Sequence, residues 1–96
     1  METKQHFQRQ AYYTHGQNKH TKRRFTVCAL IKNGMTYIGV AQCSLTDQFS
    51  RPHGRTLSLS RAIHFPIHVT ENDDIRIALD IMHEFRTEFI NAEYFR

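Results

Sequence analysis

Residues 25–43 read FTVCALIKNGMTYIGVAQC, and this stretch decides the fold of the chain. Two β-rich runs flank the pair Asn33-Gly34, which is the preferred pair for a two-residue type I′ turn. We therefore predict a β-hairpin in which residues whose numbers sum to 67 face each other across the two strands.

This register divides the hairpin into two faces. One is strongly apolar and has to be covered by another element, whereas the other is mixed. The apolar face carries Phe25, Val27, Ala29, Ile31, Ile38 and Val40. Gly39 lies in a strand interior, where glycine usually marks a bulge or the close approach of another backbone. The same register separates Cys28 from Cys43 by roughly 13 Å, which is too far for a disulfide.

A long amphipathic helix is predicted over about residues 71–94, because apolar side chains recur there every three or four positions. Thr70, with Asp73 three residues later, resembles a capping box at the helix start. The helix would be about 36 Å long, longer than the hairpin it covers. Its aromatic end is therefore a candidate partner-binding surface, and a core helix with a frayed end is the alternative. The residues of this surface are Phe85, Phe89, Tyr94 and Phe95.

The segment between the hairpin and this helix carries two conflicting patterns. Leu57 and Leu59 alternate as in a strand, whereas Leu59, Ala62 and Ile63 fit one face of a helix. We favour a short helix over about residues 55–64, with a third strand as the alternative.

Pro66 is predicted to hold a structurally important turn after this short helix. Proline lacks a backbone donor and restricts the residue before it. The neighbours Phe65 and Ile67 are apolar and are expected to be buried. Buried neighbours can hold the Phe65–Pro66 peptide bond in either the cis or the trans form, so the sequence leaves both alternatives open.

Residues 1–24 show no apolar period and are predicted to form a flexible basic arm, ahead of a single α+β domain over residues 25–96. The arm carries six Lys and Arg against one acid, whereas residues 71–96 carry seven acids against three Arg. This asymmetry favours an anionic partner for the basic part. The alternative is that the basic residues are a solvated run of charges that keeps the protein in solution. The candidate phosphate-contacting residues are Lys19, Lys22, Arg23, Arg24, Arg51, Arg55 and Arg61.

The 96 residues suit one domain, and they contain no apolar run of about 18 residues that would span a membrane. The first ten residues lack the apolar stretch of a secretory signal. Two cysteines cannot build a disulfide framework. We therefore expect a cytoplasmic protein without a membrane partner.

No catalytic or cofactor-binding motif is present in the sequence. It has no G-x-S-x-G, no G-x-x-x-x-G-K-[ST] and no G-x-G-x-x-G. Fourteen residues separate Cys28 from Cys43, whereas structural zinc sites place their cysteines about 2–4 residues apart. Pro66 also breaks the helix that would align His64 with His68. We expect a non-enzymatic protein with no cofactor and no metal.

A more specific block consists of residues 39–43 (GVAQC), 47–51 (DQFSR), 54–55 (GR) and 61–63 (RAI). It resembles a pattern in small accessory proteins of phage genomes and covers about residues 25–64. The size, the Gln-rich start and the long acidic C-terminal helix are similar to the phage anti-RecBCD family. That family binds a host recombination nuclease, so the resemblance implies a partner that processes nucleic acid in the host cytoplasm.

The hairpin and the basic segment after it also resemble a double-stranded RNA-binding domain, which implies direct binding of nucleic acid. The chain departs from that pattern in three ways. It lacks the amphipathic first helix, Gly54-Arg55 stand where a lysine cluster opens the last helix, and a long extra helix follows.

Three functional hypotheses follow from these patterns. The first is a non-enzymatic accessory protein that binds and modulates a host nucleic-acid-processing enzyme. The second is direct nucleic-acid binding, although few aromatics lie among the basic residues, which argues against a dedicated single-strand binder. The third is a homo-oligomer whose C-terminal helices pair through Phe85, Phe89 and Ile90.

Overall fold

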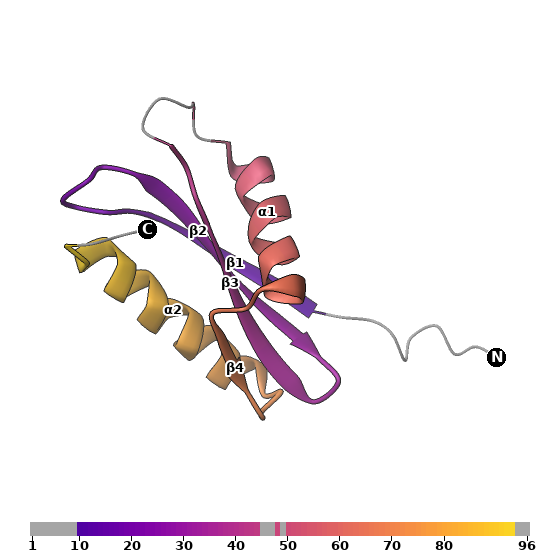
Figure 1. Ribbon diagram of the computed structural model, residues 1–96. Helices are drawn as coiled ribbons and strands as arrows, with labels where there is room; N and C mark the ends of the chain where they lie inside the picture. The colour runs from indigo at the N-terminus through magenta and orange to yellow at the C-terminus, as the bar shows by residue number, and fades with distance from the viewer. Residues whose placement is uncertain (1–9, 45–47, 49, 94–96) are drawn as a thin grey trace.

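The computed structural model describes residues 10–44, 48 and 50–93, and shows a four-stranded antiparallel sheet with two helices (Figure 1). Each strand pairs with the next one in the chain, so the order across the sheet is β1-β2-β3-β4. The predicted α+β class is confirmed. The elements are β1 (Gln10–Gln17), β2 (Arg24–Lys32), β3 (Met35–Gln42), α1 (Arg51–His64), β4 (His68–Thr70) and α2 (Ile75–Asn91).

The hairpin of β2 and β3 forms in the predicted register. Cross-strand partners keep the constant sum of 67 along the whole ladder, beginning with Phe25 and Gln42. Asn33 and Gly34 take φ angles of +55° and +78°, the positive values that a type I′ turn requires. Local turn chemistry and strand alternation are therefore sufficient to determine this part of the fold.

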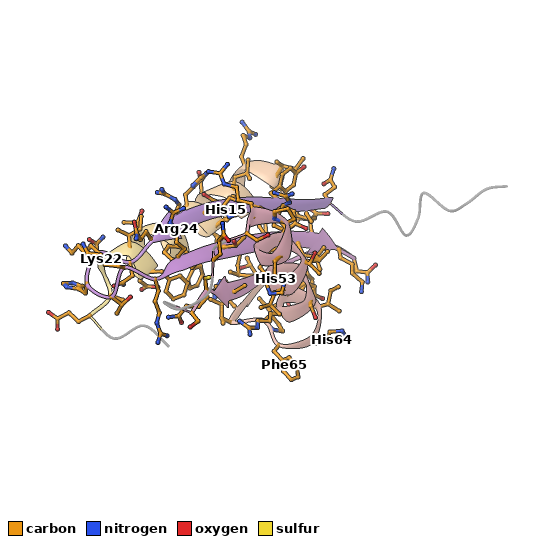
Figure 2. All side chains as sticks on the ribbon, turned by 90° about the horizontal axis from the view of Figure 1, so that it is seen from above. His15, Lys22, Arg24, His53, His64 and Phe65 are labelled. Carbon is orange, nitrogen blue, oxygen red and sulfur yellow. The ribbon has the colours of Figure 1, made fainter. Side chains whose placement is uncertain are left out.

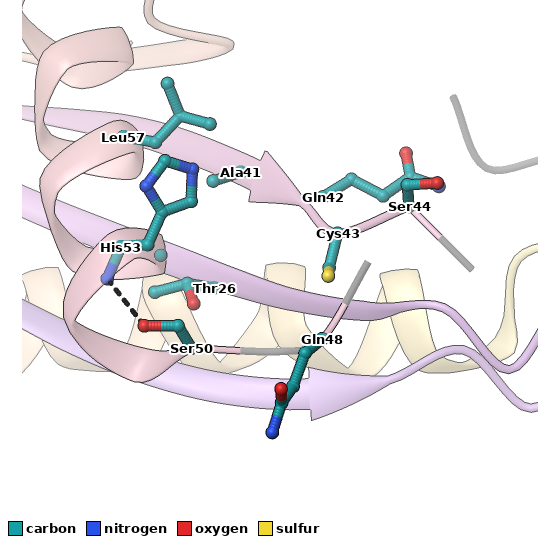
Figure 3. A pocket seen from close by; sticks show the side chains of 10 residues that line it. Thr26, Ala41, Gln42, Cys43, Ser44, Gln48, Ser50, His53 and Leu57 are labelled. Carbon is teal, nitrogen blue, oxygen red and sulfur yellow. Dashed lines mark hydrogen bonds between the residues drawn. The ribbon is translucent and has the colours of Figure 1, made fainter. Parts of the chain in front are cut away.

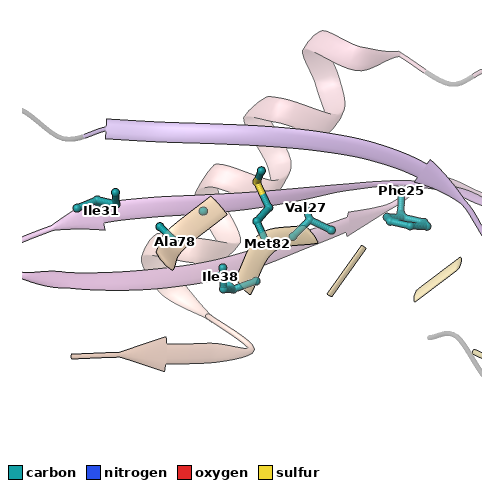
Figure 4. Close-up of a cluster of buried hydrophobic side chains, with 7 residues drawn as sticks. Phe25, Val27, Ile31, Ile38, Ala78 and Met82 are labelled. Atoms are coloured by element: carbon teal, nitrogen blue, oxygen red, sulfur yellow. The ribbon is translucent and has the colours of Figure 1, made fainter. Parts of the chain in front are cut away.

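The two helices cover opposite faces of the sheet (Figure 1). α1 covers the mixed face, where Cys28, Leu30 and Ala62 are buried. The apolar pattern of the hairpin predicts that both helices pack on its apolar face. For α1 this prediction is wrong, because its small side chains let this helix pack closely on the second face. α2 covers the strongly apolar face (Figure 4), where the buried cluster is Phe25, Val27, Ala29, Ile31, Ile38, Ala78 and Met82.

α1 approaches the sheet closely at Gly39. The buried residues of this helix are Gly54, Ser58 and Ala62, which recur every four residues. A Cβ added to Gly39 would lie 2.8 Å from the Cα of Ala62, and closer still to the carbonyl oxygen of Ser58. The close backbone approach predicted at Gly39 is therefore confirmed.

The helical alternative for residues 55–64 is confirmed, but the helix begins earlier, at Arg51. Ser50 caps it, because the Ser50 side chain accepts a hydrogen bond from the backbone N–H of His53 at 3.3 Å. Pro52 occupies the first turn, where its missing N–H leaves no helical hydrogen bond unmade.

β1 corrects the prediction of a flexible arm over residues 1–24. Residues 10–17 pair with β2 along their whole length. Tyr12 packs against the cluster under α2 and Tyr13 against the cluster under α1, so the strand alternates between the two faces. Residues 10–24 therefore belong to the sheet and the turn that joins β1 to β2. Residues 1–9 lie outside the described residues.

The start of α2 differs from the predicted one. The helix begins at Ile75, because the Asp74 side chain accepts a hydrogen bond from the backbone N–H of Arg76 at 2.8 Å and caps it. Thr70, the predicted cap, pairs with Thr36 at the end of β4 instead. The predicted periodicity continues through the remaining helix, which ends at Asn91.

The connection between α1 and β4 contains Phe65, Pro66 and Ile67. No peptide bond among the described residues is cis, so the trans alternative holds at Pro66. Phe65 is 78% exposed and Ile67 is 49% exposed. The expected burial of both is wrong, because they lead into a three-residue strand that has a neighbour on one side only.

Candidate functional site

The two helix-covered faces of the sheet differ in charge. α1 contains three arginines and no acid, whereas residues 71–93 contain seven acids against two arginines. Because the helices cover opposite faces, the asymmetry along the sequence becomes an asymmetry between two sides of the molecule. This arrangement favours anionic ligands on the α1 side and cationic ligands on the α2 side.

The structure divides the seven candidate phosphate-contacting residues into two groups. Figure 2 shows Lys22 and Arg24 at one end of the molecule, whereas His53 of α1 lies over its middle. The seven residues therefore lie on two different parts of the fold. The first group, in the turn between β1 and β2 and at the start of β2, is Lys19, Lys22, Arg23 and Arg24, and the second, on α1, is Arg51, Arg55 and Arg61.

The turn between β1 and β2 caps the C-terminus of α2. The buried Asn18 amide donates to the carbonyl oxygens of Phe89 at 2.7 Å and Ala92 at 2.8 Å. The backbone N–H of Lys19 donates to the carbonyl of Ile90 at 2.9 Å. A helix leaves its last carbonyls without internal partners, and cations near that end are favourable. The basic turn thus has a structural role, and Asn18 is a key residue that the sequence interpretation missed.

The arginines of α1 have different surroundings. Arg61 donates from Nη1 to the carbonyl of Val40 at 3.0 Å, which joins α1 to β3. Burial, followed by the charges of Arg51 and Arg55, lowers the pKa of His15 from its ordinary value of 6.5. Because His15 belongs to β1, the positive charges of Arg51 and Arg55 are felt at the β1 side of α1.

A groove of about 460 Å³ lies between β1 and α1. α1 packs mainly over β2 and β3 and reaches β1 only at its margin, so one side of β1 stays uncovered. The groove is lined by Tyr13 of β1 and by Pro52, Arg55, Ser60 and His64 of α1, among others. We call this the β1–α1 groove.

A second groove, of about 260 Å³, lies between β4 and α2 on the other side of the sheet. α2 packs over β1 and β2, which leaves β4 beside the helix rather than under it. The His68 and Phe85 rings lie 5.5 Å apart here. The lining combines apolar and acidic side chains: His68, Ile81, Glu84, Phe85 and Glu88.

Two of the predicted partner-binding residues of the C-terminal helix, Phe85 and Phe89, stack on each other with ring centroids 6.0 Å apart. Phe85 lines the β4–α2 groove, whereas the Phe89 ring packs against Phe25 with centroids 5.8 Å apart. Ile90 packs against the same core cluster, so pairing of two α2 helices through Phe89 and Ile90 would compete with their packing on the sheet. Tyr94 and Phe95 lie outside the described residues.

Three apolar side chains are exposed at the β4 edge of the sheet. Phe65 is 78% exposed, Ile67 49% and Val69 44%. We call these three residues the β4 edge surface. The sequence interpretation assigned Phe65 and Ile67 to the core because they are apolar. Phe65 caps the C-terminus of α1 and Ile67 directly precedes β4, so both lie in the connection between these two elements.

A small pocket next to the start of α1 contains Cys43 and His53 (Figure 3). Its volume of about 90 Å³ is well below that of ordinary ligand pockets, which run from about 300 Å³ upward. No carboxylate is among its described lining residues. Cys28 and Cys43 form no disulfide, as the hairpin register predicts.

Within residues 10–44, 48 and 50–93, no three His, Cys, Asp or Glu side chains gather closely enough to hold a metal ion. Neither helix of the described chain is long and apolar enough to span a membrane. Comparison with known protein families, characterised proteins and solved structures finds no match.

Proposed function

We propose that the protein is a non-enzymatic accessory protein of the phage type, which binds a host nucleic-acid-processing enzyme in the cytoplasm and alters its activity. The observation that carries the proposal is the β4 edge surface, where Phe65, Ile67 and Val69 expose apolar area at an open sheet edge. Exposed apolar surface beyond that of an ordinary monomer marks protein-binding sites. The resemblance to anti-RecBCD proteins suggests the RecBCD nuclease as the partner.

The charge of the β4–α2 groove, on the other face of β4 from Val69, supports a partner of this class. Glu84 and Glu88 line the β4–α2 groove together with Phe85. Enzymes that process nucleic acids carry basic surfaces that hold the phosphate backbone. An apolar groove with two carboxylates is complementary to such a surface and repels free nucleic acid.

The test measures binding of the full chain to purified RecBCD enzyme, together with the exonuclease activity of that enzyme on linear duplex DNA. We expect a Kd of about 1 µM or lower and a change in exonuclease activity. The double variant Phe65→Ser with Val69→Ser should raise the Kd about tenfold or more, because it removes two of the three apolar side chains of the surface.

The matched control is the double variant Ile75→Ser with Ile77→Ser, which removes two exposed apolar side chains from the start of α2. It should bind the enzyme like the unaltered chain. Absence of binding at about 10 µM enzyme, or equal reductions in both double variants, would rule out the proposed surface.

A second candidate function is direct binding of nucleic acid through the α1 side. The specific observation is that Arg51, Arg55 and Arg61 lie on one helix that has no acid. Such binding releases counterions, so the affinity should fall steeply with salt.

Gel shifts at low and moderate salt test this candidate with two variants that remove the same charge. Changing Arg51, Arg55 and Arg61 together to Gln should weaken the shift more than changing Lys22, Arg23 and Arg24 together to Ala. The turn residues surround the α2 cap and lie apart from α1. The reverse order would place the interface on the turn.

A further inference from the structure

The β1–α1 groove is open because of the way α1 sits on the sheet. The helix packs over β2 and β3, and Gly54, Ser58 and Ala62 bring it close to them. The groove along β1 that remains has a volume of about 460 Å³, within the ordinary range of about 300–1,000 Å³ for ligand sites.

The β1 side of this groove is aromatic, and the α1 side mixes polar side chains with the apolar Pro52, Leu59 and Ile63. Tyr13 of β1 contributes the aromatic ring. Thr56, Ser60 and His64 follow one another at intervals of four along α1, so they form one row along the helix. Arg55 stands in the next row and brings a permanent positive charge.

The electrostatic surroundings are uniformly positive. Arg51 lies one helical turn before Arg55, and both lower the pKa of His15 on the neighbouring strand. None of the described lining residues is acidic. A ligand of this groove therefore carries negative charge, together with a flat or apolar part that contacts Tyr13.

A single-stranded nucleic acid has both parts, because its phosphates alternate with bases whose faces are open for stacking. A duplex presents phosphates but keeps its bases stacked inside, out of reach of a tyrosine on the floor of a groove. An acidic peptide presents carboxylates but no regularly repeated flat ring.

We propose that the β1–α1 groove binds single-stranded nucleic acid, with a base stacked on Tyr13 and the adjoining phosphates held by Arg55 and Arg51. The proposal rests on the second candidate function, direct binding of nucleic acid, and specifies its ligand. The sequence argues against a dedicated single-strand binder, because few aromatic residues lie among the basic ones along the chain. Tyr13 and Arg55 are far apart in the sequence, but they line the same groove.

The test compares a fluorescent oligothymidine of about 15 nucleotides with a hairpin duplex by anisotropy, at two salt concentrations. We expect tighter binding of the single strand. Tyr13→Leu should weaken single-strand binding about tenfold and leave the duplex signal unchanged, whereas Tyr13→Phe should keep the affinity because it keeps the ring. Arg55→Gln should flatten the log–log salt dependence by about 0.7 for each phosphate that the variant no longer neutralises.

Lys22→Gln is the matched control for Arg55→Gln, because it removes one charge at the far end of the molecule. It should leave single-strand affinity within about twofold. Tyr13→Trp provides a second measurement that does not depend on a loss of binding. The chain has no tryptophan, so this variant carries a single one, whose fluorescence the oligothymidine should quench and the duplex should not.

Each result bears on the proposals separately. Equal binding of single strand and duplex, unaffected by Tyr13→Leu, would overturn the groove site and leave binding by the α1 side standing. Binding of neither would overturn both. Competition by polyglutamate as strong as that by oligothymidine, with no quenching of the Tyr13→Trp variant, would assign the groove to an acidic peptide and overturn the proposal.

Discussion

Asn18 connects two parts of the molecule that are 71 residues apart in the sequence. Its amide nitrogen donates to two carbonyls at the end of α2, and its Oδ1 accepts from the backbone N–H groups of His20 and Thr21. All of the hydrogen-bonding capacity of this buried side chain is used. A single asparagine therefore shapes the β1–β2 turn and fixes the C-terminus of α2 upon it.

Replacing Asn18 by Ala should lower the free energy of unfolding by about 3 kcal/mol, because four part-buried backbone groups lose their hydrogen-bond partner together. Urea denaturation followed by circular dichroism measures the change. Gln17→Ala is the control, since the Gln17 amide donates to the carbonyl of Lys22 in an exposed position, and a cost of about 0.5 kcal/mol is expected. Equal costs for the two variants would disprove the capping role.

His15 should make stability depend on pH. Burial and the nearby Arg51 and Arg55 lower its pKa below 6.5, so the folded chain keeps the ring neutral where the unfolded chain protonates it. The unfolded state then binds more protons, and the free energy of unfolding is full above about pH 6.5 and falls as the pH drops toward the lowered pKa.

Denaturation midpoints between about pH 5.5 and 7.5 measure this slope. His15→Gln should remove most of it, whereas His83→Gln, an exposed change on α2, should keep it. An unchanged slope in His15→Gln would show that another group is responsible. In the folded chain the His15 Nδ1 lies 2.8 Å from the Thr26 hydroxyl, a hydrogen bond that a glutamine amide can replace.

The packing of α1 on the sheet depends on two glycines, one in the sheet and one in the helix. Gly39 of β3 lies under the helix backbone, and Gly54 of α1 lies over the side chain of Thr26. This small-residue packing is what allows a helix with few large apolar residues to bury the second face of the sheet.

Gly39→Ala should lower the free energy of unfolding by about 3 kcal/mol, because its Cβ would overlap the backbone of α1 and force the helix away from the sheet. Gly34→Ala is the matched control. Its φ is positive but no atom lies within 4 Å of the added Cβ, so only the backbone cost of about 1 kcal/mol is expected. Thermal unfolding of both variants measures the two losses of stability. Similar losses in Gly39→Ala and Gly34→Ala would contradict the close packing of α1 on Gly39.

Elements whose signals are local were predictable from the sequence. The hairpin depends on Asn33-Gly34 and on alternation within its own two strands, so its register could be assigned residue by residue. α2 depends on a repeat that runs through its 17 residues. Both of its ends were predicted a few residues too far out. Thr70 pairs with Thr36, a pairing that no local pattern contains, and the helix ends at Asn91, before the predicted residue 94.

Elements that depend on distant parts of the chain were not predictable. β1 has a polar composition and becomes a strand through pairing with β2, whose residues also pair with β3. The β1–α1 groove requires that pairing and the packing of α1 on the mixed face. Tyr13 and Arg55 line the same groove only because β1 pairs with β2 and α1 packs on the mixed face.

On the scale of the whole molecule, the fold separates charges of opposite sign. Basic side chains gather on α1 and in the β1–β2 turn, and acids gather on the α2 side. The two proposed binding surfaces, the β1–α1 groove and the β4 edge surface, lie at opposite edges of the sheet. Binding of a nucleic-acid strand at one edge is therefore compatible with binding of an enzyme at the other.

The same separation should make the protein more stable in salt. Like charges that gather on each side repel one another, and added salt screens them. Raising NaCl from about 0.05 M to 0.5 M shortens the Debye length from roughly 14 Å to roughly 4 Å, and should raise the free energy of unfolding by about 1 kcal/mol. Urea midpoints at the two salt concentrations measure this gain.

The double variant Arg51→Gln with Arg55→Gln should gain less, because part of the repulsion on the α1 side is already removed. A decrease of stability in salt would show instead that attraction between the oppositely charged sides dominates.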